Sequence, residues 1–386
     1  MANLLGIPHA AMISLTDLVD KCAEIQPGMD VLILAQRDGL YGGVNLVDEE
    51  AIAWTAAVVE SRGANPTILW FDEPNVTHKW RYPPIVKGAV GGSDLVLNFS
   101  STLTNEEIEE FRMHVRASNT WNIRVFAVTS KLLMTEWAQT PYELVSTIRR
   151  VSSKPFMTDG AKFVMTDPNG THIEGETILP VSRGRIPGVA YGKPRKETGR
   201  YAPWPEWLHT QVRCRNINGV YNFNSMLGWW AIHIGIAPEW ETPVSVEITD
   251  GVMTKISGGP EAQAISDFLK EMEEKVGEGI WKFDTFHFGV HPNAHVLPSQ
   301  CPHELHRRLI NHSHSSNLHF HLGSAPANEN YPYWPHITAD IQHATLKVGD
   351  MLAYDNGWLC ALDDPEVHAV EALYPGRPGV PKRPAK

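Results

Sequence analysis

Histidines are concentrated in one part of this 386-residue chain, where eleven of the eighteen fall between His287 and His343. The window contains the runs FHFGVHPNAH, HELHRRLINHSHSSNLHFHLG and WPHITADIQHA. The carboxylates of Asp284, Glu304 and Asp340 lie among them. Neutral imidazole is the commonest metal ligand in proteins. These residue types, gathered in one window, predict a metal site.

The metal ligands are predicted from the local pattern around each histidine. His287 alternates with phenylalanines before a glycine turn, as on a strand, and His291 follows four residues later. His336 and Asp340 are the strongest pair, although residues at i and i+4 of a regular strand lie roughly 13 Å apart. We therefore expect a bend or a helical turn between them. The predicted ligands are His287, His291, His336 and Asp340.

Other residues of the window are candidates for catalysis and substrate binding. The run HELH is one residue shorter than the zinc-protease motif HExxH, which excludes that reading. The predicted catalytic groups are Glu304, His314 as a general base, with His312 of the same loop as the alternative, and His319 as a ligand or substrate contact. Arg307 and Arg308 fit a bidentate clamp on a substrate carboxylate, and Tyr333 and Trp334 fit stacking on a flat ring. The alternatives are buried hydrogen-bonded imidazoles, a solvated helix face and a loop anchored by aromatic rings.

Composition narrows the class of partner. The net charge of −11 argues against nucleic acid or an anionic membrane as the main partner, since both require a basic patch. No apolar run approaches the roughly 20 residues that span a bilayer, and the N-terminus lacks the pattern of a signal peptide. Four widely spaced cysteines form no disulfide framework, which predicts a reducing cytoplasm.

The first half of the chain alternates strands with helices, which predicts a parallel sheet covered on both faces. No phosphate-binding glycine motif is present in this half. The loop 100–104 follows a strand at the edge where parallel sheets bind ligands. It therefore either faces the active site or is an ordinary turn with a helix cap. The predicted strands are 31–35, 67–70, 95–99 and 125–128, and the predicted helices are 15–25, 47–62, 106–115 and 142–151.

The second half has shorter strands interrupted by Gly, Pro and Asp. Residues 244–248 and 252–256, joined through Asp250-Gly251, predict a β-hairpin, and 261–275 predicts a helix. The tail 376–386 is rich in proline and basic, as in a loose or clamping extension. The predicted division is an α/β domain at 1–155 with a mainly parallel sheet, and at 156–386 an α+β catalytic domain that is rich in antiparallel strands and binds the metal.

Three segments carry a resemblance to a known family: IGIAPEWETPVSVEITDGVMTKISGGPEAQAISDFLK (234–270), GRYAPWPEW (199–207) and HFGVHPNAH (287–295). They resemble the aminopeptidase T-like metalloproteins, which include leucyl aminopeptidases, 2,5-dihydroxypyridine 5,6-dioxygenases and a 5-nitroanthranilate aminohydrolase. The resemblance implies an N-terminal α/β domain followed by a hairpin-rich domain that carries the metal. It also implies a homo-oligomer.

The chain departs from the family in ways that bear on the reaction. It lacks the glutamates of the aminopeptidases, which implies one metal ion instead of two. His319 matches a ligand of those relatives. The dioxygenases use a histidine before a G-x-x-P turn and an H-x-D pair. Here the first position falls near Thr285, and the pair is replaced by His336-x-x-x-Asp340. These differences favour hydrolysis over oxygenation.

Together these observations predict a two-domain cytoplasmic metalloenzyme with one divalent transition metal ion, for which Mn, Fe and Zn all suit N/O ligands. The expected reaction is attack of metal-activated water on a small aromatic acid with loss of ammonia. The first alternative is an Fe(II) ring-cleaving dioxygenase of the 2,5-dihydroxypyridine type, and the second is a metallo-aminopeptidase. A metal-storage or metal-sensing protein is a further alternative, and it would bind several ions per chain.

Overall fold

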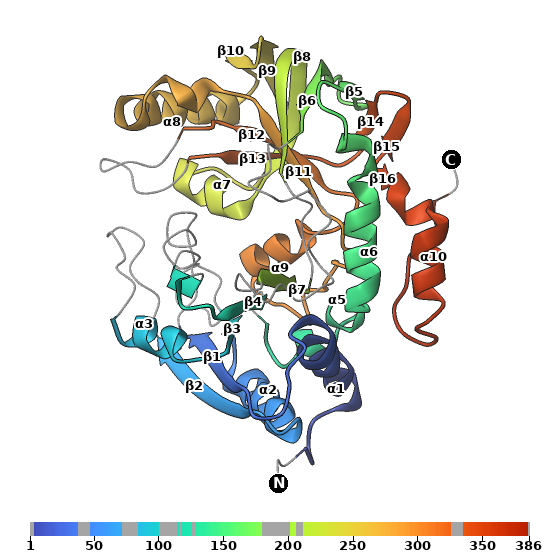
Figure 1. Cartoon of the computed structure of the whole chain (residues 1–386). Helices are drawn as coiled ribbons and strands as arrows, with labels where there is room; N and C mark the ends of the chain where they lie inside the picture. The colour runs from blue at the N-terminus through green and yellow to red at the C-terminus, as the bar shows by residue number, and fades with distance from the viewer. Residues whose placement is uncertain are drawn as a thin grey trace.

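The structure is a computed structural model, and it describes residues 4–37, 47–71, 84–99, 114–115, 117–125, 128–179, 201–205, 211–325 and 335–384. In these ranges the chain builds two sheets, one parallel and one antiparallel, each with its own helices (Figure 1). This arrangement confirms the predicted fold class.

The first sheet has five strands in the order β2-β1-β3-β4-β7, and every neighbouring pair is parallel. Helices α1, α2 and α3 lie around it, with a π-helical segment at Asp17–Cys22 after α1 (Figure 1). The elements are α1 His9–Thr16, β1 Asp30–Gln36, α2 Glu49–Ser61, β2 Asn65–Phe71, α3 Pro84–Gly91, β3 Leu95–Phe99, β4 Trp121–Val125, α5 Glu136–Gln139 and β7 Tyr201–Trp204.

Strand β1 shows why the sheet is covered on both sides. Its residues Val31 and Ile33 belong to the core that also holds α1 and α2, whereas Leu32 and Leu34 belong to a smaller core with α3. A strand that is apolar on both faces must be packed on both faces. The prediction for this strand is confirmed.

Two predicted elements are displaced. The strand expected at 125–128 is β4, Trp121–Val125, in which the polar Asn122 and Arg124 alternate with apolar side chains, so the apolar run VFAV was a misleading signal. The helix expected at 15–25 begins earlier, at His9. Loop 100–104 and most of helix 106–115 lie outside the described residues.

The second sheet follows the order β11-β12-β13-β8-β6-β5-β14-β15-β16, and β8 also pairs with β9 and β11. The predicted hairpin is β9–β10, and Asp250 and Gly251 adopt the positive φ that its turn requires. The strands are β5 Lys162–Thr166, β6 His172–Ile178, β8 Val212–Met226, β9 Glu239–Thr249, β10 Val252–Ser257, β11 Thr285–Phe288, β12 Leu318–Leu322, β13 Ile337–Ile341, β14 Thr345–Val348, β15 Met351–Asp355 and β16 Trp358–Leu359.

Helices cover this sheet and connect it to the first one. The predicted helix at 142–151 is α6, and its Leu144 and Ile148 lie in the core of the second sheet. Strand β7 follows residue 155 in the chain, but it pairs with β4 and belongs to the first sheet. The division at 155/156 therefore stays a prediction. The helices are α6 Tyr142–Ser152, α7 Gly228–Ile234, α8 Pro260–Val276, α9 Glu304–Asn311 and α10 Pro365–Glu371.

The C-terminal tail clamps the two halves together. Arg377 forms a bidentate ion pair with the buried Asp17, at 2.9 Å, and donates to the carbonyl of Gln139. The Asn293 amide donates to the Gly379 carbonyl. The tail thus follows the clamping alternative, and it ties α1 and α5 to the loop that precedes α9.

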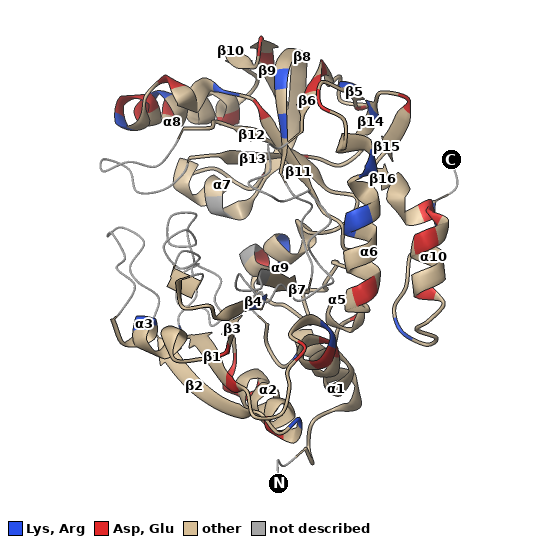
Figure 2. Cartoon of the chain, in the orientation of Figure 1, with Lys and Arg blue, Asp and Glu red and all other residues tan. Residues whose placement is uncertain are grey.

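Two further features concern charge and hydropathy of the helices. Acidic and basic side chains are interspersed along α8, whereas α10 carries acidic side chains without Lys or Arg (Figure 2). Within the described residues, no helix is both long and apolar enough to cross a membrane.

Candidate metal centre

Three neighbouring antiparallel strands place the candidate ligands in one row. His287 of β11 lies opposite His319 of β12, and His319 lies opposite Asp340 of β13. His321 shares a strand face with His319, because side chains alternate along a strand. The intervening Phe320 belongs to the core on the other face. The alternation of histidine with apolar residues therefore builds an imidazole-lined face above a hydrophobic one.

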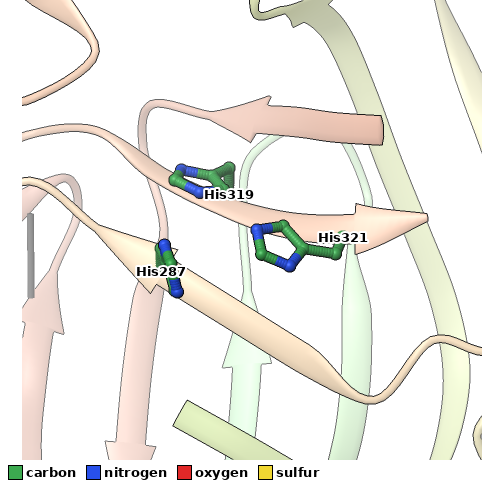
Figure 3. Close-up of side chains that lie close together, drawn as sticks. All are labelled: His287, His319 and His321. Atoms are coloured by element: carbon green, nitrogen blue, oxygen red, sulfur yellow. The ribbon is translucent and has the colours of Figure 1, made fainter. Parts of the chain in front are cut away.

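His287, His319 and His321 form a three-histidine cluster in which the candidate ligand atoms all lie within 4.8 Å of one another. Figure 3 shows their rings gathered between β11 and β12. The ring centroids are 4.9 Å apart for His287–His321 and 5.4 Å for the other two pairs. Nitrogen ligands of a tetrahedral zinc lie roughly 3.3 Å apart, given Zn–N of about 2.0–2.1 Å. Small side-chain rotations would bring these nitrogens to that spacing.

Burial keeps two of these imidazoles neutral. His319 and His321 are 1% and 2% exposed. Desolvation lowers the pKa of both well below the usual 6.5, and the neighbouring histidines, including His312, lower it further. A neutral imidazole is the form that binds a metal.

The buried Nδ1 of His319 also has no hydrogen-bond partner among the described residues. An unsatisfied buried polar atom carries a desolvation cost of about 1–3 kcal/mol. A bound cation would relieve this cost, so the residues present fit a metal ion.

Two polar side chains contact the Nδ1 atom of His321. Its Nδ1 lies 3.1 Å from Thr285 Oγ1 and 3.2 Å from Gln211 Nε2. These contacts occupy Nδ1, so a metal contact would use Nε2. A ligand imidazole carries its proton on the nitrogen that does not bind the metal, so the Thr285 hydroxyl is the contact that can accept Nδ1–H and orient the ring, whereas the Gln211 amide nitrogen only donates.

A second group, consisting of His312, His319 and Asp340, also brings its candidate ligand atoms within 4.8 Å. His312 Nδ1 lies 3.3 Å from Asp340 Oδ1. The rings of His312 and His319 stack, with centroids 4.2 Å apart and an interplanar angle of 28°. Lone pairs lie in the ring plane, so two stacked rings cannot both address one ion unless one of them rotates. The rings of His319 and His321 in the three-histidine cluster are also nearly parallel, at 27°, so one ring would have to rotate in either group.

A cavity of about 250 Å³ opens beside the second group. His312 and Asp340 form part of its wall. The other lining residues are Ser225, Met226, Leu227, Glu239, His295, Arg308, Asn311, His314, Ser316, Asn317 and Gln342.

The predicted ligands do not all meet. His287 belongs to the first group and Asp340 to the second, whereas His336 contacts His321 and Trp230, at ring-centroid distances of 4.9 and 5.6 Å. The expected bend between His336 and Asp340 is wrong, because Ile337–Ile341 is a strand in register with β12. A strand separates residues at i and i+4 by too much for one ion.

His291 also lies outside both groups. It is buried and bridges to His314, and its Nδ1 accepts a hydrogen bond from the backbone of Asn293. Desolvation, together with His314, lowers its pKa to about 3. These contacts give His291 a structural role in the loop before α9.

The predicted catalytic and binding residues are divided between cavity and surface. His314 lines the cavity, and its Nδ1 lies 2.8 Å from Ser316 Oγ. Glu304 is corrected to the surface, because its side chain is 59% exposed in the first turn of α9 and pairs with Arg308. Arg308 lines the cavity, but Arg307 does not and donates to the Cys301 carbonyl. Tyr333 and Trp334 lie outside the described residues.

The sequence pattern assigned no role to His321 or Thr285, and it gave His312 only as an alternative general base. The strand pattern LHFHL was a usable signal for His321, because it places His321 on the face of His319. Nothing local to Thr285 indicates its contact with His321, which depends on the pairing of β11 with β12.

The comparisons with known proteins concern the fold. No protein-family model and no curated protein sequence matches the chain. The structure is similar to 2,5-dihydroxypyridine dioxygenase from Pseudomonas putida KT2440, with a TM-score of 0.62 and 14% identity, over 91% of this chain and 98% of that one. AmpT from Thermus thermophilus has a TM-score of 0.49 and 10% identity over the same shares. The chain thus has the two-domain aminopeptidase T-like fold that the sequence resemblance implied.

Proposed function

We propose that this protein is a metal-dependent hydrolase that acts on a small aromatic acid through metal-activated water and expels ammonia. The observation that carries the proposal is the convergence of His287, His319 and His321. Three imidazoles are a donor set with which a zinc ion that keeps water in its fourth position lowers the pKa of that water to about 7.

The chain's own residues supply the remaining parts. The Thr285 hydroxyl orients His321, and burial keeps His319 and His321 away from bulk water. His312 and His314 present imidazoles to the adjacent cavity, where a substrate proton can be accepted. The aromatic acid and the loss of ammonia are proposed from the family resemblance.

A second candidate function is ring cleavage by a non-haem Fe(II) dioxygenase. Two histidines and one carboxylate, as in His312, His319 and Asp340, are the donor set of such oxygenases. The cavity wall includes two of these three residues, and the dihydroxypyridine dioxygenase shares the fold.

One experiment separates the two reactions. Purified protein, reconstituted in turn with Mn²⁺, Fe²⁺ and Zn²⁺, is incubated without oxygen with 5-nitroanthranilate and, in air, with 2,5-dihydroxypyridine. Ammonia release without oxygen is the expected result. Oxygen uptake coupled to loss of the pyridine chromophore overturns the hydrolase in favour of the dioxygenase. Cleavage of a leucine anilide alone overturns both.

Metal analysis of two variants identifies the donor set. His321→Gln is expected to lose the metal, whereas Asp340→Asn retains it, since only His321 belongs to the three-histidine cluster. The reverse pattern favours the second group. Binding of several ions per chain in the unmodified protein indicates storage instead of catalysis.

A further inference from the structure

The cavity beside the candidate metal centre has opposite chemical character on two of its walls. Its inner wall comes from the end of β13 and the loop after α9, with Asp340 and Asn317. Its outer wall includes Arg308 of α9 and Glu239 at the start of β9. At about 250 Å³ it lies below the roughly 300–1,000 Å³ of drug-sized pockets. It therefore suits one molecule of the size of a single substituted ring.

Two side-chain oxygens of the inner wall receive no hydrogen bond. The Oδ1 atoms of Asp340 and Asn317 are both buried and accept no hydrogen bond among the described residues. His312 Nδ1, 3.3 Å from Asp340 Oδ1, is not aligned to form one. The Asp340 side chain is only 12% exposed. Two buried acceptors without donors favour a ligand that carries N–H groups.

The outer wall offers a cation. Arg308 contacts Glu304 through Nε and Nη2, and Glu239 through Nη1. A guanidinium has five N–H donors, so some remain for another anion. The exposed Glu239 can also be displaced, because its side chain is 58% exposed. A planar carboxylate is the preferred partner of this guanidinium.

We infer that this cavity is the binding site of a small aromatic acid that bears a neutral amine, whose N–H groups contact the Asp340 and Asn317 oxygens and whose carboxylate contacts Arg308. The inference rests on the proposed function only for the identity of this molecule as the substrate. An aromatic acid bearing an amine meets both walls. The amine would then lie beside His319, because the candidate ligand atoms of His319 and Asp340 are within 4.8 Å.

Calorimetric titration of the metal-free full-length chain tests the inference independently of catalysis. The probes are 2-aminobenzoate, 2-hydroxybenzoate, benzoate and aniline. We expect 2-aminobenzoate to bind at least tenfold more tightly than each of the other three. Failure of the metal chemistry leaves this measurement unaffected, so the two proposals can fail separately.

Variants assign each wall. Asp340→Asn should weaken 2-aminobenzoate at least tenfold and leave benzoate unchanged, whereas Arg308→Gln should weaken both acids and leave aniline unchanged. Asn317→Ala removes the second acceptor and keeps the test valid if Asp340→Asn fails to fold. Two exposed residues of other ion pairs provide matched controls, Asp267→Asn and Arg215→Gln.

Three results would overturn the inference. One is equal affinity for benzoate and 2-aminobenzoate, which removes the amine contact. Another is unchanged 2-aminobenzoate binding in both inner-wall variants, Asp340→Asn and Asn317→Ala. The last is no detectable binding of any probe to the folded, metal-free protein.

Discussion

Strands β3 and β12 are both fully buried over five residues, yet they are built for different purposes. Strand β3 reads LVLNF and carries one polar side chain, so nearly all of its surface contributes to hydrophobic packing. Strand β12 reads LHFHL and places His319 and His321 on one face, opposite the packed Phe320. Burying imidazoles costs free energy unless they gain partners.

The comparison teaches that burial alone does not distinguish a structural strand from a functional one. A buried polar atom without a partner does not distinguish them either, because Asn98 Oδ1 and Nδ2 on β3 and His319 Nδ1 on β12 all lack one in the described structure. The distinction lies in what surrounds the polar side chain. His319 has His287 and His321 close enough to share one ion, whereas the neighbours of Asn98 along β3 are apolar.

The largest effects are expected from one substitution in each of the two strands. His319→Gln should weaken metal binding by more than about 100-fold, beyond the 10–100-fold cost of losing an outer partner of a ligand. Leu97→Ala in β3 should instead lower the free energy of unfolding by about 2–5 kcal/mol and leave the metal affinity unchanged. Chelator competition and urea unfolding measure the two quantities. Equal metal affinity in the two variants would remove the distinction.

Acid should destabilise the histidine region selectively. The pKa of His291 is lowered to about 3 in the folded chain, mainly by desolvation, so the unfolded chain binds its proton first as the pH falls below 6.5. The free energy of unfolding is therefore constant above pH 6.5 on this account, and falls between pH 6.5 and about 3. The slope is about 1.4 kcal/mol per pH unit for one such group.

Urea unfolding of metal-free protein between pH 7 and 4 measures this slope. His291→Gln should reduce it by the equivalent of one proton, whereas the exposed His9→Gln should not change it. An unchanged slope in His291→Gln would show that His291 is protonated in the folded chain.

The smallest effect concerns the orientation of one imidazole. Thr285→Val removes the hydroxyl that lies 3.1 Å from His321 Nδ1, and should weaken metal binding by about 10–100-fold. Thr285→Ser retains the hydroxyl and should restore most of the affinity. The measurement is chelator competition, with unfolding of the metal-free protein as a control for stability. Wild-type affinity in Thr285→Val would show that Thr285 only fills space.

Much of the fold could be predicted from local patterns. The apolar run of β1, the hairpin turn at Asp250-Gly251 and the helix α8 all follow from short-range rules of burial and turn chemistry. Strand β4 differs from the predicted run because its signal is an alternation, with Asn122 and Arg124 between apolar side chains, which a short apolar run does not reveal. Side-chain exposure there depends on what packs above the sheet.

The candidate site was predicted less completely. The histidine window was identified, but the pairing of His336 with Asp340 was not supported, because their neighbours form a straight strand. Glu304 was placed at the site on proximity in sequence alone, and the start of α9 carries it to the surface. His312 belongs with Asp340 because the loop after α9 folds back onto β13.

The sequence by itself determined the types of chemistry available: many neutral imidazoles, a few carboxylates and an alternation that places two histidines on one strand face. Only the tertiary structure decided which of them meet. Registers between strands far apart in the chain place His287 opposite His319 and His319 opposite Asp340. Such registers depend on long-range packing, because a shift of one residue would turn every side chain to the other face.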